Sequence, residues 1–352
     1  DHAASLEPSE FKALVSGIRE LEEALGDGRK RSVSQGEMIN RENLAKSLVA
    51  ASDLKKGIVL ESRHLKSRSP GLGLSAQFYQ QILGRKLQRS MQEEDYFYPS
   101  DLRDGRIEPK NYLFKRPWGV PVRYHDFSEY ELKISPDIFE FHLSYSDLDL
   151  NIEDYLSGSY DSGLVVHAPE LFSGSRLMDL ASADKDYRYY SITETQRVID
   201  ITRSLKKYFP KTKSPMIVAN IGGFTMDEPL SSSELESYYF RFSDSLSLLD
   251  TEGVELIPQT MAPFPWHFGG QRYQNLFLHS DEILYWCEKL NLRMCFDISH
   301  SRLMCNHFGV DFYDFVKKIA PITGHLHLGD ARGVNGEGLQ IDDGDIDFSQ
   351  LG

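Results

Sequence analysis

Two short apolar segments in the last quarter of the chain end in side chains that can bind a metal ion or transfer a proton. The first contributes Asp297 and His300, and the second, one helix length later, contributes His325 and His327. Carboxylates and imidazoles are ligands of divalent ions, and imidazole also titrates near neutral pH. When such residues lie at the carboxyl ends of neighbouring parallel strands, they converge on one site. The pattern therefore favours an enzyme.

The elements that would position these side chains are repeated strand–helix units, which begin near Trp118. Seven strands are expected, at Gly119–Tyr124, Ile138–Leu143, Leu164–His167, Met216–Ile221, Glu255–Gln259, Met294–Ile298 and Gly324–Leu328. The helices expected between them include Thr193–Tyr208, Ser231–Leu249, Ser280–Leu290 and Phe312–Ile319. Repeated units of this kind form a parallel sheet, and a closed barrel of this type has eight strands. We therefore expect an α/β fold that ends in an incomplete (β/α)8 barrel, with strand eight beyond Gly352.

The first part of the chain has a less regular pattern. Residues Glu7–Leu25 carry one apolar stripe at helical spacing, and Gly26 follows them, so a single helix is expected. Short apolar runs at Ser47–Ala51 and Gly57–Leu60 predict strands, and Ser75–Leu83 predicts a helix. The resulting division is 1–28 for the first helix, 29–45 for a linker, 46–103 for a small β-rich domain, 104–116 for a second linker and 117–352 for the barrel.

Composition limits the classes of protein to which the chain can belong. Of its 352 residues 40% are hydrophobic, which suffices for sizeable cores, and no segment approaches the ~20 apolar residues of a membrane helix. A formal charge of -14 disfavours a nucleic-acid binder, because phosphate contacts need concentrated Lys and Arg. The three cysteines lack ligand or disulfide spacing, and no signal peptide is recognisable. We therefore expect a cytoplasmic protein without membrane or nucleic-acid partners.

The N-terminal part resembles the sialic acid (N-acetylneuraminate) synthases. The segment Asp1–Lys12 is similar to the last segment of their catalytic barrel, and residues from Ala50 onward are similar to their C-terminal SAF, or antifreeze-like, domain. The most specific match is the loop Arg68–Ser75, which reads RSPGLGLS. The resemblance covers roughly residues 1–98. It implies that residues 1–28 are the last helix of a synthase barrel.

This resemblance implies a carbon–carbon bond-forming transferase. Sialic acid synthases condense phosphoenolpyruvate with an amino sugar, and their SAF domain reaches across a homodimer to place one arginine in the partner's sugar site. By this match Arg68 is the reaching arginine, and Asp1 is the carboxylate that accepts sugar hydroxyls. A guanidinium on a loop stiffened by Pro and Gly offers fixed donors to sugar oxygens. Without the resemblance, Arg68 reads as an exposed loop arginine and Asp1 as a frayed terminus. The other synthase groups are expected upstream of position 1.

The C-terminal part resembles the xylose isomerase-like barrels, which include sugar isomerases, ketose epimerases and endonuclease IV-type repair enzymes. Four stretches carry the resemblance in the order of the strands: His167–Glu170, Asp297–His300, His325–Asp330 and Gly344–Phe348. The resemblance covers residues 117–348. It implies a TIM barrel that acts on a sugar or sugar phosphate as an isomerase or epimerase.

The sugar-acting members hold a divalent metal with a Glu, an Asp, a His and a Glu from strands five to eight. Carried over to this chain, the resemblance assigns Asp297 and His327 as ligands and puts Gln259 where the family has the glutamate of strand five. A glutamine carbonyl oxygen can bind the metal but brings no negative charge, so weaker metal binding is expected. The implied cofactor is a divalent ion, with Mn, Mg, Co and Zn all open. The alternative for Asp297 is a strand-end carboxylate that caps a loop.

Other residues near the strand ends suit sugar chemistry. His167 and His300 are predicted acid–base groups, because imidazole can relay a proton between sugar atoms; the alternative for each is a structural histidine. Arg332 is predicted to bind a phosphate or carboxylate of the substrate, or else to form a surface salt bridge. Trp266 lies in a loop rich in aromatics and prolines and is predicted to pack on a sugar ring, or on the barrel itself.

Three functional classes follow from these features. A repair nuclease is disfavoured, because that family has a histidine on strand four, where this chain has Asn220, and another after strand seven, where none follows His327. The favoured class is a bifunctional protein of nonulosonic (sialic acid-like) sugar biosynthesis, in which a synthase is joined to a metal-dependent isomerase or epimerase. The remaining class, which Gln259 supports, is a synthase whose barrel is a non-catalytic sugar-binding or assembly module.

Overall fold

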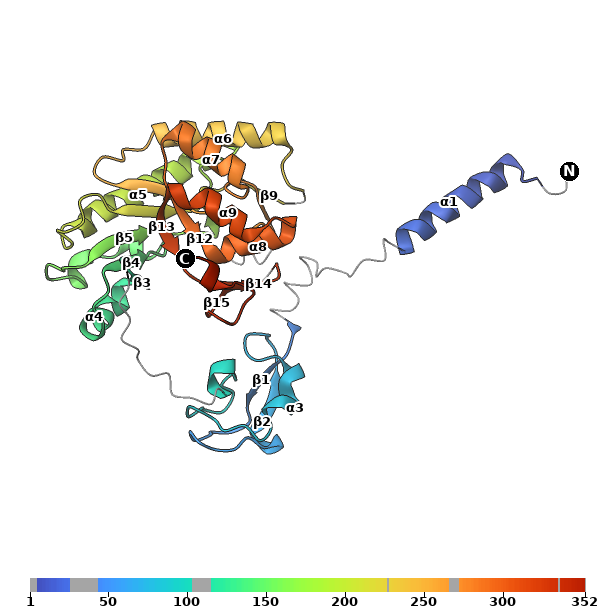
Figure 1. The fold of residues 1–352 in the computed structure, drawn as a ribbon, viewed down its shortest axis with the longest axis horizontal. Helices are drawn as coiled ribbons and strands as arrows, with labels where there is room; N and C mark the ends of the chain where they lie inside the picture. The colour runs from blue at the N-terminus through green and yellow to red at the C-terminus, as the bar shows by residue number, and fades with distance from the viewer. Residues whose placement is uncertain are drawn as a thin grey trace.

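The computed structural model describes residues 5–25, 44–102, 115–226, 228–265, 272–334 and 336–351. They form a single helix, a small β-rich domain and a larger α/β domain (Figure 1). The helix, α1 (Pro8–Leu25), confirms the prediction for Glu7–Leu25. No residue of α1 is buried, and its apolar stripe, which includes Phe11, Leu14 and Leu21, is exposed.

The small domain is built around one antiparallel pair of strands. Strand β1 (Ser47–Ala50) pairs with β2 (Leu65–Arg68), so that Ser47 lies opposite Arg68. The short helical elements around them are η2 (Ser62–His64), η3 (Ala76–Phe78), α3 (Tyr79–Ile82) and η4 (Pro99–Leu102). The core consists of Leu48, Ala50, Leu54, Leu60, Leu65, Ile82, Leu87, Met91, Phe97 and Leu102. These side chains come from both strands, α3, η4 and the loops between them, and hold the domain together around a single small core.

One predicted strand of the small domain is wrong. Gly57–Leu60 forms no strand, and within this run Val59 makes an isolated β-bridge. Gly57 has φ +90°, and the turn at this residue interrupts the extended backbone. The partner of β1 is β2 instead, in which only Leu65 is buried, so β2 lacks the apolar run that predicts a strand. The helix predicted over Ser75–Leu83 is present as η3 and α3.

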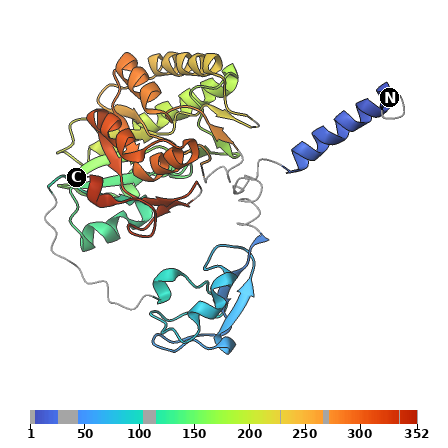
Figure 2. The ribbon, with the colours of Figure 1, turned by 45° about the vertical axis from the view of Figure 1, so that its right-hand side comes forward.

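The larger domain contains the seven strands predicted from the sequence. They are β3 (Gly119–Val122), β4 (Ile138–His142), β5 (Gly163–His167), β8 (Met216–Ala219), β10 (Glu255–Pro258), β12 (Met294–Asp297) and β13 (Thr323–His327). The first five are hydrogen-bonded side by side in chain order and run parallel. A parallel bridge between Gln259 and Cys295 connects β10 to β12, which pairs in parallel with β13. The predicted parallel sheet is confirmed, and Figure 2 shows this domain from a second side.

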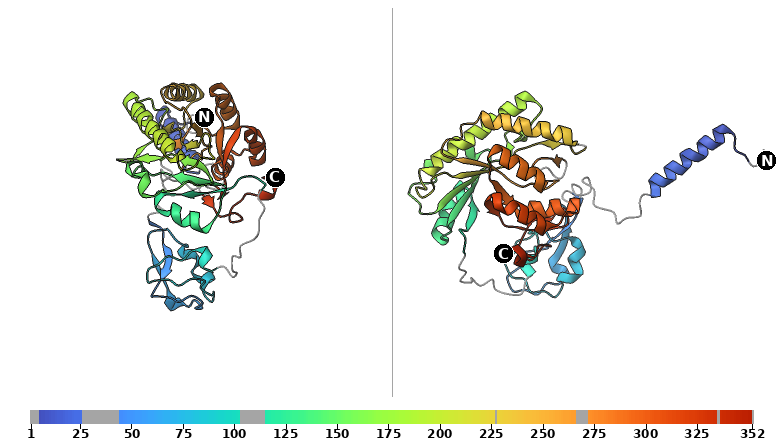
Figure 3. Two further views of the ribbon diagram at one scale, coloured as in Figure 1. Left: turned by 90° about the vertical axis from the view of Figure 1, so that its left-hand side faces the viewer. Right: turned by 45° about the horizontal axis from the view of Figure 1, so that its top comes forward.

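Helices cover the outer side of this sheet (Figure 3). They are α4 (Tyr124–Lys133), α5 (Lys185–Lys206), α6 (Ser232–Ser247), α7 (Ser280–Leu290), α8 (Ile298–Phe308) and α9 (Phe312–Ile319). The predictions for α6, α7 and α9 are confirmed to within a few residues. Helix α5 begins at Lys185 instead of Thr193, because the Asp184 side chain caps it by accepting hydrogen bonds from the N–H groups of Asp186 and Tyr187.

Helix α8 is not predicted from the sequence, and it follows β12 without a loop. Asp297 ends the strand, and its side chain accepts a hydrogen bond from the His300 N–H at 2.9 Å, which caps the helix. The apolar run of β12 continues into Ile298 and hides this boundary. The cap fixes Asp297 and His300 relative to each other.

Shorter elements lie in the loops. The antiparallel pairs are β6 (Leu171–Phe172) with β7 (Arg176–Leu177), β9 (Phe224–Thr225) with β11 (Tyr273–Gln274), and β14 (Asp330–Arg332) with β15 (Gly336–Leu339). The short 3-10 helices are η5 (Asp147–Asp149), η6 (Ile152–Asp154), η8 (Ala320–Ile322) and η9 (Phe348–Leu351). Of these, β14 and β15 follow β13 and carry a residue of the candidate site.

Side chains alternate between the two sides of each strand. One side packs on the helices and forms the main core, with residues such as Phe139, Val166 and Ile217. The other side faces the interior of the barrel. A separate apolar cluster lies there, made of Val165, Val218, Ile257 and Cys295. Toward the carboxyl ends of the strands the inward positions are polar, and these positions form the candidate site.

Candidate functional site

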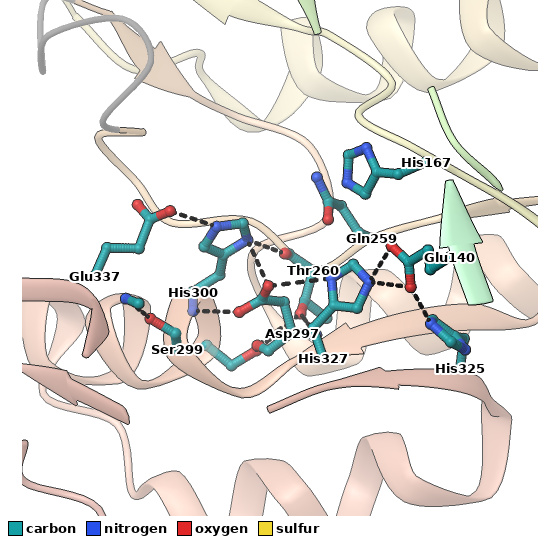
Figure 4. A network of polar contacts seen from close by, with 12 residues as sticks. Glu140, His167, Gln259, Thr260, Asp297, Ser299, His300, His325, His327 and Glu337 are labelled. Carbon is teal, nitrogen blue, oxygen red and sulfur yellow. Dashed lines mark hydrogen bonds and ion pairs between the residues drawn. The ribbon is translucent and has the colours of Figure 1, made fainter. Parts of the chain in front are cut away.

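Polar side chains fill the barrel interior near the carboxyl ends of the strands. The strands, or the residues directly after them, contribute Glu140, His142, His167, Gln259, Asp297, His325 and His327. Figure 4 shows most of these groups, which come from distant parts of the chain, pointing toward one another. Active sites of TIM-barrel enzymes are built at this end of the strands, so this set of side chains is the candidate active site.

Glu140 on β4 lies against three imidazoles. Its carboxylate oxygens lie 2.6 Å from His142 Nε2, 2.6 Å from His325 Nε2, and 3.0 and 3.1 Å from His327 Nε2. Burial alone would raise the pKa of Glu140, but the His327 charge and the imidazole hydrogen bonds hold it well below its usual range. Glu140 is therefore a buried anion surrounded by nitrogen atoms.

A second group surrounds His300 at the start of α8. Its Nδ1 lies 2.9 Å from Thr260 O, and its Nε2 lies 2.9 Å from Glu337 Oε1. Burial would lower the pKa of His300, but the carboxylates of Asp297 and Glu337 raise it to about 10. His300 is thus an imidazolium at neutral pH. The second oxygen of Glu337, Oε2, is buried and has no hydrogen-bond partner within the described part of the chain.

His327 connects the two groups through its two ring nitrogens. Nε2 faces Glu140, whereas Nδ1 lies 3.4 Å from Asp297 Oδ2. Burial would raise the pKa of Asp297, but His300 and His327 lower it to about 2, so Asp297 is an anion. Since each ring nitrogen binds one metal ion, a metal could share His327 with Asp297 through Nδ1 or with Glu140 through Nε2. The two carboxylates therefore define two alternative donor groups.

Gln259 lies at the end of strand five, as predicted, and is buried. Its Nε2 donates to Glu170 Oε1 at 3.3 Å, and its Oε1 has no hydrogen-bond partner among the residues described. A buried carbonyl oxygen without a partner costs free energy unless a ligand or ion bonds to it. Burial also raises the pKa of Glu170 to about 7, so this carboxyl group exchanges its proton near neutral pH.

The predicted site residue His167 lies among the other histidines of the site. The His167 ring stacks 4.6 Å from that of His142 and 5.7 Å from that of His327, between centroids. Burial and the neighbouring His142 lower the pKa of His167 to about 3. His167 is therefore neutral at neutral pH, which suits a hydrogen-bonding group better than an acid. Asp1 and Trp266 lie outside the described residues.

Both predicted arginines contact acidic neighbours in their own domains. Arg332 donates to the backbone oxygen of Asp343 in the adjacent loop. Arg68, at the end of β2, is exposed, and its Nε lies 3.2 Å from Glu94 Oε2. These contacts do not test a role in substrate binding, so both assignments stay predictions.

The sequence pattern does not single out Glu140, His142 or Glu337, and it gives Glu170 only as the end of the stretch His167–Glu170. Glu140 and His142 do leave a signal, because they are polar residues at alternate positions of an otherwise apolar strand, Ile138–His142, and therefore share its inward side. Glu337 leaves none, since the pairing of β14 with β15 brings it to His300.

These residues fit the divalent ion that the family resemblance implies. Among the described His, Cys, Asp and Glu side chains, Glu140, His142 and His327 form a group whose donor atoms all lie within 4.8 Å of one another. Asp297 lies beside the same histidine, and the unpaired oxygen of Gln259 is a further potential ligand.

Family models match both domains. The model of the xylose isomerase-like TIM barrel matches residues 126–351, and that of the SAF domain matches residues 45–103. The first match covers more than half of this chain. Within the described residues, no helix combines the length and apolar character needed to cross a membrane.

Similar curated proteins include three synthases. The N,N'-diacetyllegionaminic acid synthase of Campylobacter jejuni is 40% identical over 95 residues, which are 27% of this chain and 28% of that protein. A pseudaminic acid synthase of the same species is 40% identical over 103 residues, 29% of each chain. The human N-acetylneuraminate-9-phosphate synthase is 33% identical over 96 residues, 27% of this chain and 26% of that protein. This chain therefore spans less than a third of the length of these relatives.

Similar solved structures include two sugar epimerases or epimerase-like proteins. A D-tagatose 3-epimerase-like protein is 21% identical with a TM-score of 0.49, and the match covers 67% of this chain and 84% of that one. A D-psicose 3-epimerase in the presence of D-fructose is 15% identical with a TM-score of 0.44, and the match covers 67% and 79%.

Proposed function

This chain belongs to the family of xylose isomerase-like TIM barrels, and we propose that its barrel isomerises or epimerises a sugar with the help of a divalent metal ion. The observation that carries this proposal is the convergence of His300, Asp297 and Glu170 at the strand ends. Together they offer a cation, an anion and a carboxyl group with a pKa of about 7. Such a set can remove a proton from carbon and supply one to oxygen.

In this proposal Glu170 is the base and His300 is the acid. Ionised Glu170 takes the proton from the carbon beside the sugar carbonyl, and the electron pair of that C–H bond moves toward the carbonyl oxygen, which His300 protonates. When water protonates the same carbon from the opposite face, an epimer forms and the carbonyl oxygen gives its proton back to His300. When Glu170 returns its proton to the former carbonyl carbon, the hydroxyl group on the first carbon loses its proton to water and an isomer forms. The unpaired Oε2 of Glu337 accepts a sugar hydroxyl.

A divalent ion, when bound, would polarise the sugar carbonyl. His327 would hold it in either donor group, and Asp297 and Gln259 are the additional ligands that the family resemblance assigns. Two observations support this set: Asp297 Oδ2 lies 3.4 Å from His327 Nδ1, and Gln259 Oε1 is buried without a partner in the described residues. Mn, Mg, Co and Zn all stay open.

Deuterium exchange tests the barrel proposal without requiring the natural substrate. The chain is incubated with Mn²⁺ or Co²⁺ and a panel of ketoses, aldoses and N-acetylamino sugars in D₂O. We expect deuterium at the carbon beside the carbonyl of at least one sugar, detected by NMR and mass spectrometry. Glu170→Gln should slow this exchange by about 10²- to 10⁴-fold, whereas Glu153→Gln, at an exposed position, should leave it unchanged.

The competing function is a non-catalytic sugar-binding or assembly module. Gln259 favours it, because it puts an uncharged side chain where the family resemblance expects a glutamate. Under this alternative, the chain binds a sugar in calorimetry but exchanges no deuterium into any member of the panel. That outcome would contradict the proposed activity.

For the whole protein we propose a bifunctional enzyme of nonulosonic acid biosynthesis. The SAF match and the synthase relatives support a condensing activity that uses phosphoenolpyruvate and an amino sugar. Joining the two activities would raise the local concentration of a shared sugar intermediate. A full-length gene product without a synthase barrel upstream of Asp1 would contradict this proposal.

Arg68 is proposed to act across a homodimer, in the synthase site of the partner. Its exposure at the end of β2 is compatible with this role. Mixing an Arg68→Ala protein with one inactivated in the synthase barrel should restore part of the synthase activity, because one site of the mixed dimer is then intact. No recovery from verified mixed dimers would count against the exchange.

A further inference from the structure

Glu140 and its three imidazoles form a donor group that does not include the predicted ligand Gln259. Glu140 and His142 come from strand two, β4, and His325 and His327 come from strand seven, β13. The three Nε2 atoms all lie 2.6–3.1 Å from the carboxylate of Glu140. This convergence joins residues separated by 185 positions in the chain, so the fold creates it and no local motif does.

We propose that Glu140, His142 and His327 bind a divalent transition-metal ion, through the carboxylate and the Nε2 atoms of both histidines. This proposal depends on the proposed function only in assuming that the barrel needs a metal ion. It replaces the expected ligands on strands five and six with two ligands on strand two. The three donor atoms lie within 4.8 Å of one another, close enough to share one ion. Two imidazoles and one carboxylate form a common site for Zn, Fe or Co and leave coordination positions open.

The charges of the donor groups support this assignment. At the strand-five position neutral Gln259 stands where the family has a glutamate, whereas Glu140 supplies an anion next to two nitrogen ligands. Nitrogen donors also favour a transition metal over Mg²⁺ or Ca²⁺, which prefer oxygen. The unpaired oxygen of Gln259 is then left to accept a sugar hydroxyl.

The neighbouring side chains are placed as supports for this ion. His327 uses Nε2 for the metal, so its Nδ1–H points to Asp297 Oδ2 at 3.4 Å, and a carboxylate in this position orients a ligand histidine. His325 donates from Nε2 to the second oxygen of Glu140 at 2.6 Å, which fixes the carboxylate. The His142 side chain is 38% exposed, so an ion can reach the site from solvent.

Metal titration of the whole chain tests the assignment independently of activity. A chelator first removes bound metal from the chain, which is then titrated with Co²⁺. Calorimetry measures the affinity for Co²⁺, and the visible absorption of the bound ion reports its ligands. We expect one Co²⁺ per chain. Glu140→Gln and His142→Ala should each weaken binding by more than about 100-fold, beyond the about 10- to 100-fold loss expected for Asp297→Asn as a supporting residue. Gln259→Ala should leave the affinity unchanged.

His125→Ala is the matched control, since His125 is a well-exposed histidine on α4. Circular dichroism shows whether each variant is folded, and His142 is exposed enough to be removed without a cavity. Two outcomes overturn the assignment. Either folded wild-type chain binds no Co²⁺, so that Glu140 is only hydrogen-bonded to its histidines, or His142→Ala binds normally while Gln259→Ala and Asp297→Asn do not. Metal binding as expected without deuterium exchange would contradict the proposed activity alone.

Discussion

Glu282 on α7 is a carboxyl group in an apolar setting, away from the candidate site. The Tyr239 hydroxyl donates to it, and the Phe277 N–H donates to that hydroxyl at 2.8 Å. Burial raises the pKa of Glu282 from 4.5 to about 7, so the folded chain binds this proton more tightly than the unfolded chain. The resulting stability is full below the unfolded pKa and is lost as the pH rises through about 7. Between about pH 5 and pH 8 we expect a loss of about 2–3 kcal/mol.

Thermal unfolding of Glu282→Gln as a function of pH checks this expectation. The amide stays neutral and still accepts a hydrogen bond from Tyr239, so this variant should lose the pH slope and unfold at a higher temperature than the wild type near pH 8. Glu288→Gln, at an exposed position of the same helix, should keep the slope. A Glu282→Gln variant with the full wild-type slope would mean that other groups carry the pH dependence.

Part of the candidate site can be predicted from residue types alone. Asp297, His300 and His327 are recognisable because each stands at or just after the end of an apolar run, where strand ends in this fold carry chemistry. Glu140 and His142 are harder to find, because their partners on β13 are remote in sequence and meet them only through the curvature of the sheet. Residue type and spacing reveal strand-end positions but not which of them face one another across the barrel.

One buried carboxylate fixes the hairpin β14–β15 and the loop that follows it. Asp330 accepts hydrogen bonds from the N–H groups of Ala331 at 2.8 Å, Ile346 at 3.2 Å, Asp342 at 3.1 Å and Gly344 at 2.8 Å. Gly344 approaches so closely that a Cβ there would lie 2.1 Å from Asp330 Oδ1. Asp330→Asn puts an NH₂ group where an oxygen accepts, which leaves buried N–H groups without a partner and should cost about 1–3 kcal/mol.

Chemical denaturation measures this loss in the free energy of unfolding, and hydrogen exchange shows which backbone amides lose protection. Protection should fall mainly in residues 336–346, and Glu337, which lies on β15, should hold His300 less firmly. Asp342→Asn is the control, because Asp342 is exposed and has φ +76°, a conformation that asparagine tolerates. Wild-type protection of the loop in Asp330→Asn would contradict this role of Asp330.

At the scale of elements, apolar runs predict the barrel strands well because β4, β5, β8, β10 and β12 are largely buried on both sides. The predictions fail at segments whose side-chain pattern does not reveal their backbone conformation. Helix α8 follows β12 with no break in apolar character, and β2 forms a strand although only Leu65 is buried in it. Backbone hydrogen bonds to a neighbouring strand can support a segment that side-chain pattern alone does not identify.

At the scale of the whole molecule, the chain contains two main hydrophobic cores with no residue in common. The change from an irregular pattern to repeated strand–helix units indicates this division in the sequence, although the exact boundaries stay predictions. The core of the small domain contains far fewer buried side chains than the core of the barrel, and small cores give marginal stability. The two domains should therefore unfold in separate transitions, with the small domain as the less stable one.

Differential scanning calorimetry of the whole chain tests this independence with a pair of matched core substitutions. Phe97 in the small domain and Phe127 in the barrel are both fully buried, so replacing either with alanine should cost about 3–5 kcal/mol. Phe97→Ala should lower only the small-domain transition, and Phe127→Ala should lower only the barrel transition. Added Co²⁺ should raise the barrel transition alone, because a ligand stabilises the unit that binds it. One transition that shifts as a whole in both variants would show that the domains unfold as a single cooperative unit.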